Sequence, residues 1–114
     1  MHIALGLFVL AAVTGLFLAL QHFRGKPLSL GAALAHGAFA ASGLLMLLWT
    51  LTRTGFTGKP AAAAGIFVVA ALGGFYLLAN HLRGKKLPTP VVVIHALAAV
   101  TAFALLAVVV LGLA

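Results

Sequence analysis

The sequence predicts an all-α integral membrane protein, a bundle of four transmembrane helices built from two tandem-duplicated helical hairpins. Two features of composition carry the membrane part of this prediction. Of the 114 residues, 65% are hydrophobic and only 6% are charged, and the chain contains neither Asp nor Glu. A soluble domain has charged side chains at about a quarter of its positions. This chain has too few to form such a surface, so we expect lipid to surround most of it.

Four continuous apolar runs supply the expected helices, at residues 3–23, 28–51, 61–82 and 91–113. Each is long enough to cross a hydrocarbon core about 30 Å thick at about 1.5 Å per residue. Strands of a membrane barrel would alternate in polarity, and these runs do not. The first run lacks the basic start and small-residue cleavage pattern of a secretory signal. We therefore expect it to remain in the mature protein, with residues 1–114 forming one domain.

The predicted connections are short and basic. Arg24-Gly25-Lys26-Pro27 joins the first pair of helices, Arg83-Gly84-Lys85-Lys86 joins the second pair, and residues 52–60 join the two pairs. Gly58 and Pro60 are expected to interrupt helical structure within the connection at residues 52–60. Five Lys or Arg residues fall on the side of the paired turns and two on the other, which predicts cytoplasmic turns and both termini outside, in the periplasm. The compact chain, rich in Ala, Gly and Leu, favours a bacterial inner (plasma) membrane.

A tandem repeat relates the two hairpins. Gln21-His22-Phe23-Arg24-Gly25-Lys26 recurs as Asn80-His81-Leu82-Arg83-Gly84-Lys85, and subtraction gives one offset for both histidine pairs, 81 − 22 = 59 and 95 − 36 = 59. The repeats cover about 1–55 and 60–114. Because each contains an even number of helices, both copies have the same orientation, related by a pseudo-twofold axis along the membrane normal.

His36 and His95 are the expected centre of the bundle. Each lies about nine residues beyond its turn, at matched depth, on the second and fourth helices. Two imidazoles facing each other in this way can be the axial ligands of a haem b iron. Small residues lie four and seven positions later on the same helical face and would accommodate a flat macrocycle: Ala40, Gly43, Ala99 and Ala102. Ordinary close packing of membrane helices is the alternative explanation for these small residues.

A second layer of polar residues lies near the turns. His22 and His81 differ from His36 and His95 by about 10 Å in depth, too far to share one metal atom with them. We expect this layer to contact the haem propionates, through His22, His81, Arg24, Lys26, Arg83 and Lys85. Alternatively, the basic residues set the topology and bind anionic lipid, and either histidine could hydrogen-bond a quinone.

The residues that are missing exclude several classes of protein. Without Cys there are no disulfides, thiolate metal sites or covalently attached haem. Without Asp or Glu, a Ser-His-Asp triad is impossible, and proton-coupled transport and hydrolytic zinc chemistry lose their usual carboxylates. The basic charge lies in membrane-flanking turns rather than on a nucleic-acid surface, so no nucleic-acid partner is expected. Bis-histidine haem ligation needs no carboxylate.

With His36 and His95 facing each other, the chain resembles four-helix transmembrane b-type cytochromes and the haem-bearing membrane anchors of respiratory enzymes. This resemblance rests on those two residues alone. It implies an electron-transfer protein that works with quinone or other membrane subunits, or as a homo-oligomer. Two other functions stay open: a non-catalytic accessory subunit that binds lipid or partners, and a quinone-binding protein without haem.

Overall fold

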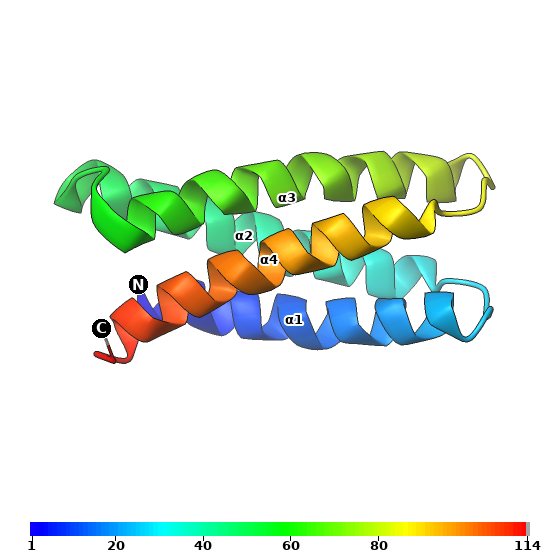
Figure 1. Ribbon diagram of the computed structural model, residues 1–114, viewed down its shortest axis with the longest axis horizontal. Helices are drawn as coiled ribbons and strands as arrows, with labels where there is room; N and C mark the ends of the chain where they lie inside the picture. Colours follow the sequence, from blue (N-terminus) through cyan, green and yellow to red (C-terminus); the bar gives the residue numbers. More distant parts are fainter. Residues whose placement is uncertain (114) are drawn as a thin grey trace.

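The computed structural model describes residues 1–113 and is all-helical. Its helices are α1 (His2–Phe23), α2 (Leu30–Thr54), α3 (Gly58–Leu82) and α4 (Thr89–Val110). Figure 1 shows them side by side in an elongated bundle, whose longest dimension is 42 Å. Each helix is long and apolar enough to cross a membrane. The predicted all-α bundle of four such helices is confirmed.

The helices follow chain order around the bundle. The closest packing lies within the hairpins, α1 with α2 and α3 with α4, and lesser contacts join α2 to α3 and α1 to α4. Helices α1 and α3 therefore lie diagonally opposite each other, as do α2 and α4. Both hairpin turns lie at one end of the bundle, here called the turn end, and both chain termini lie at the other (Figure 1). Residues near the two turns thus share one end of the molecule.

The two hairpin turns have the same backbone structure. Gly25 and Gly84 adopt φ values of 67° and 69°, a left-handed conformation that glycine enters without steric cost. The N–H of Lys26 donates to the carbonyl of Gln21 and that of Lys85 to Asn80, both at 2.9 Å. The N–H of Gly25 also donates to the carbonyl of His22 and that of Gly84 to His81, both at 3.1 Å. Together the two bonds are the Schellman arrangement that ends a helix and satisfies its last carbonyls.

The predicted connection at residues 52–60 is too long. Helix α2 continues to Thr54, where Gly55 with φ 105° ends it, and α3 already begins at Gly58. Pro60 does not break α3, because in the first turn of a helix its missing N–H has no intrahelical partner to lose. The other ends differ by a few residues: α2 begins two residues later than predicted, where Ser29 caps it by accepting from the N–H of Ala32 at 3.2 Å.

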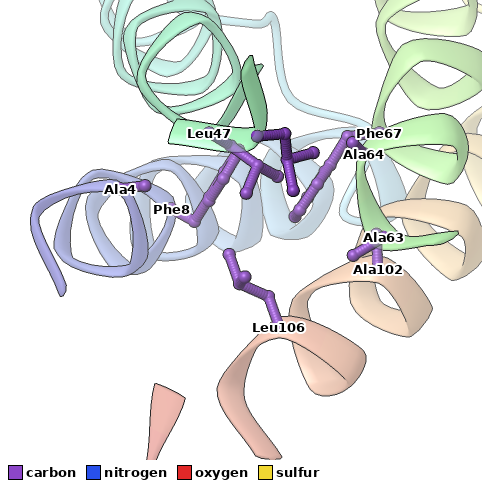
Figure 2. Close-up of a cluster of buried hydrophobic side chains, with 9 residues drawn as sticks. Ala4, Phe8, Leu47, Ala63, Ala64, Phe67, Ala102 and Leu106 are labelled. Atoms are coloured by element: carbon purple, nitrogen blue, oxygen red, sulfur yellow. The ribbon is translucent and has the colours of Figure 1, made fainter. Parts of the chain in front are cut away.

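The tightest core lies in the half of the bundle nearer the termini. There the rings of Phe8 from α1 and Phe67 from α3 stack across the diagonal, with centroids 3.9 Å apart and planes 3° from parallel. Leu47 from α2 and Leu106 from α4 are fully buried beside them, as Figure 2 shows. Alanines fill the remaining contacts, so the helices approach closely at this level.

The outer surface of the bundle is apolar along its length. Large side chains on all four helices are more than 40% exposed, including Leu16, Leu45, Leu72 and Val100. In water such a surface would be strongly unfavourable, whereas lipid tails solvate it without cost. The structure is consistent with a multi-pass membrane protein.

Candidate functional site

The structure brings His36 and His95 together in the middle of the bundle. They extend from the diagonal helices α2 and α4, and their ring centroids are 6.1 Å apart with planes 85° from parallel. Both side chains are partly buried. Neither belongs to a group of three or more potential metal ligands among residues 1–113, so this centre offers two imidazoles and no further protein donor of that kind.

Each imidazole is oriented by one strong hydrogen bond to the neighbouring helix of its own hairpin. His36 Nδ1 lies 2.7 Å from the carbonyl oxygen of Ala11, and His95 Nδ1 lies 2.7 Å from that of Ala70. A carbonyl oxygen only accepts, so both Nδ1 atoms carry the proton. In a neutral imidazole this leaves a lone pair on Nε2. The site therefore presents two Nε2 atoms able to bind a metal.

Glycines let α1 and α3 approach these rings. A Cβ atom added at Gly15 would lie 2.8 Å from His36 Cε1, and one at Gly74 would lie 3.1 Å from His95 Cε1. Both distances are shorter than a normal carbon–carbon contact of about 3.5 Å or more. A larger residue at either position would displace the ring or the helix, so the glycines are part of how each histidine is held.

The small residues predicted to lie against a macrocycle have two different environments. Gly43 and Ala102 are buried, whereas Ala40 and Ala99 are only partly buried. A Cβ at Gly43 would lie 3.1 Å from the Phe8 ring. Gly43, seven residues after His36, thus faces the Phe8 ring, and Ala102, seven residues after His95, belongs to the same buried cluster as Phe8 and Phe67.

The second polar layer surrounds a cavity of about 620 Å³ at the turn end, here called the turn-end cavity. His22 and His81 line it together with Lys26 and Lys85. His22 Nε2 shares a hydrogen bond of 3.0 Å with the Thr89 hydroxyl. The complete lining within the described residues is His22, Phe23, Gly25, Lys26, Pro27, Leu28, His81, Gly84, Lys85, Lys86, Leu87 and Thr89.

Four of the six residues expected in this layer therefore meet at one cavity. Arg24 and Arg83 are the C-caps of α1 and α3, and neither is among the described residues that line the cavity. Sequence reasoning missed Lys86 and Thr89. Lys86 is part of the basic turn and could have been included, but no sequence pattern places Thr89 beside His22, since α4 reaches that point only by tertiary packing.

Sequence reasoning also missed the partners of the central histidines and the aromatic stack. A signal existed, because the offset of 59 that pairs His36 with His95 also pairs Ala11 with Ala70 (70 − 11 = 59) and Phe8 with Phe67 (67 − 8 = 59). The identical residues at these positions did not stand out, because most of the residues around them are also apolar. The bond from His36 to Ala11 and the bond from His95 to Ala70 thus join residues at the same two positions of the repeat.

Comparisons with models of known protein families, with curated proteins and with solved structures found no match. The class of this protein is therefore defined by its own structure, as a four-helix, membrane-type bundle. Its distinguishing features are a central pair of oriented imidazoles and a basic cavity at the turn end.

Proposed function

We propose that this protein is a membrane electron-transfer protein of the b-type cytochrome kind, with one haem b held between His36 and His95. The observation that carries the proposal is the pairing of these two imidazoles, 6.1 Å apart and drawn from diagonal helices. Haem supplies reversible one-electron chemistry at its iron. His36 and His95 would hold the iron, and the apolar helices around them would limit the access of water to that centre.

The separation of the rings suits one metal atom between them. A metal–imidazole bond is about 2 Å long, so two imidazoles on opposite sides of one atom have ring centres about 6 Å apart once the ring radii are added. The observed 6.1 Å agrees with that value.

The hydrogen bonds to Ala11 and Ala70 support the same role. A metal-bound histidine usually donates its second ring N–H to a carbonyl or carboxylate, which fixes the tautomer and makes the ligand more basic. Both histidines do this at 2.7 Å. A purely structural histidine would be expected to use both ring nitrogens for contacts within the bundle. Here the fixed Nδ1 protons leave the lone pairs of both Nε2 atoms available to a metal.

The proposal includes the duplication and its symmetry. The helix ends on either side of each hairpin turn, the turn bonds, the histidine bonds and the two stacked rings lie at positions separated by 59 residues, which is what two copies of one hairpin about a pseudo-twofold axis would produce. With five basic residues at the turn end and two, Arg53 and Lys59, at the other, the turns would face the cytoplasm of a bacterial inner membrane. Both termini would then lie in the periplasm.

The short connections leave no domain to receive a soluble donor. Electrons would therefore pass between the haem and a quinone or another membrane subunit. This choice of partner rests on the size of the loops, the longest of which between described helices run from Arg24 to Ser29 and from Arg83 to Pro88.

A visible spectrum of the detergent-purified protein from haem-replete cells tests the proposal. We expect sharp α and β bands after dithionite reduction, lost in His36→Ala and in His95→Ala. The double variant His22→Ala/His81→Ala is the matched control, because it also removes two histidines but leaves the proposed ligands, and it should keep the bands. A colourless parent protein would refute haem binding. Lipid extraction for quinone and partner pull-down would then test the quinone-binding and accessory-subunit alternatives.

A further inference from the structure

The turn-end cavity gathers positive charge that nothing in the chain neutralises. Lys26, Lys85 and Lys86 line it together with His22 and His81, and the sequence contains no Asp or Glu. All three lysines are exposed, so solvent and salt screen part of their mutual repulsion, and an anion from outside the chain bound between them would relieve the rest. The proposed iron ligands are separate residues, so the charge at the turn end requires its own explanation.

The backbone adds to the positive potential of this cavity. Thr89, which lines it, is the first residue of α4. In this first turn Pro90 has no N–H, and the N–H groups of Val91 and Val92 donate to the Pro88 carbonyl. The N–H of Thr89 therefore remains at the positive end of the helix dipole. The Thr89 hydroxyl lies 3.0 Å from His22 Nε2, which positions a second polar group at the same point. An oxyanion here would meet hydroxyl, imidazole and ammonium groups together.

The rest of the lining is apolar. Phe23, Leu28 and Leu87 also border the cavity, and the Phe23 ring is 60% exposed. The cavity lies where the apolar helices end, at the level where hydrocarbon gives way to head groups. A ligand with an anionic head and an apolar tail matches both parts of this lining, whereas a small hydrophilic anion matches only the basic part.

We propose that the turn-end cavity is a binding site for the phosphate group of an acidic phospholipid. The lysines act as point charges on the phosphate, which is a common role for Lys, and the apolar residues contact the first part of the acyl chains. Free inorganic phosphate has the same anionic chemistry and is the other source of such a group. None of the cavity residues is a proposed iron ligand, and the haem propionates expected at four of them are the competing source of an anion.

Two matched double variants separate a specific site from general surface attraction. Lys26→Gln/Lys85→Gln removes two charges that line the cavity. Arg24→Gln/Arg83→Gln removes two charges from the same turns, at residues that do not line it. Native mass spectrometry of the full chain in detergent would measure binding of phosphatidylglycerol to each, with phosphatidylcholine as the zwitterionic comparison. We expect the lysine variant to bind phosphatidylglycerol about 10- to 30-fold more weakly, and the arginine variant to bind it within about twofold of the parent.

Equal losses in the two variants would overturn the proposal, because attraction would then depend on total charge. Equal affinity of the parent for the two lipids would also overturn it. Displacement of phosphatidylglycerol by millimolar inorganic phosphate would keep the phosphate site but assign it to the free ion. The same titration on His36→Ala/His95→Ala separates this inference from haem binding: unchanged affinity supports it, whereas lipid binding seen only in this haem-ligand variant would show that propionates fill the cavity and would refute it.

Discussion

Gly15→Ala should disturb His36, whereas the same change at Gly6, the other glycine of α1, should not. The new Cβ would lie 2.8 Å from His36 Cε1. The imidazole has little freedom to retreat, because Nδ1 is held at 2.7 Å by the carbonyl of Ala11 on the same helix. Either that hydrogen bond lengthens or α1 moves away from α2.

The size of the effect follows from the overlap. Carbon atoms in contact lie about 3.5 Å apart or more, so the added methyl group is about 0.7 Å too close. Overpacking of this kind costs about 1–3 kcal/mol, and replacing glycine within a helix returns about 0.5–1 kcal/mol. Gly15→Ala should therefore destabilise the bundle by about 0.5–2 kcal/mol. At Gly74 the corresponding distance is 3.1 Å, so Gly74→Ala should cost less.

Thermal unfolding in detergent would measure these effects, with absorbance of any bound haem as a second readout. Gly6→Ala is the control, because it adds the same methyl group to the same helix with nothing within 4 Å, and it should be neutral or stabilising. The expected order of stability is Gly6→Ala, then Gly74→Ala, then Gly15→Ala. If Gly15→Ala proved as stable as Gly6→Ala, with an unchanged spectrum, the close approach of α1 to His36 would be wrong.

Three further predictions address the core, the turns and the topology. Phe8→Ala should destabilise the protein by about 1–3 kcal/mol in detergent unfolding, below the soluble-protein range because lipid replaces water, whereas Phe17→Ala, at a ring 50% exposed, should have little effect. Gly84→Ala should lower the free energy of unfolding by about 1–2 kcal/mol in the same assay, because Gly84 has φ 69° and a residue with a Cβ is strained in this left-handed conformation. An unchanged melting temperature would contradict this. The chain has no Cys, so single Lys85→Cys and Phe56→Cys variants should react with impermeant thiol reagents from opposite sides of the membrane, and labelling from one side would refute the topology.

Much of the fold could be predicted because the relevant signals are local. Continuous apolar runs identified four helices, and glycines in basic segments identified the two hairpin turns. The connection between the hairpins was placed wrongly, since Thr52 to Thr54 remain helical and Pro60 lies in the first turn of α3. Helix ends depend on caps and on a single left-handed glycine, Gly55, which hydropathy does not detect.

The candidate site could be predicted only in part. The repeat offset singled out His36 and His95, and the structure places them side by side. It also brings His22 and His81 to one cavity with two of the four expected basic residues. The repeat offset pairs Ala11 with Ala70 but does not mark them as acceptors, because any backbone carbonyl has the same chemistry and only packing decides which one a side chain reaches.

The sequence by itself predicted four helices apolar enough to cross a membrane and singled out the pairs of chemically matched residues, because hydropathy and repeated residues are properties of the chain. The tertiary structure decided which residues touch. It brought the Phe8 and Phe67 rings together across the bundle at 3.9 Å, set each imidazole against a glycine of the neighbouring helix, and placed Thr89 beside His22. These contacts depend on helix rotation and separation, which small residues permit but no local pattern specifies.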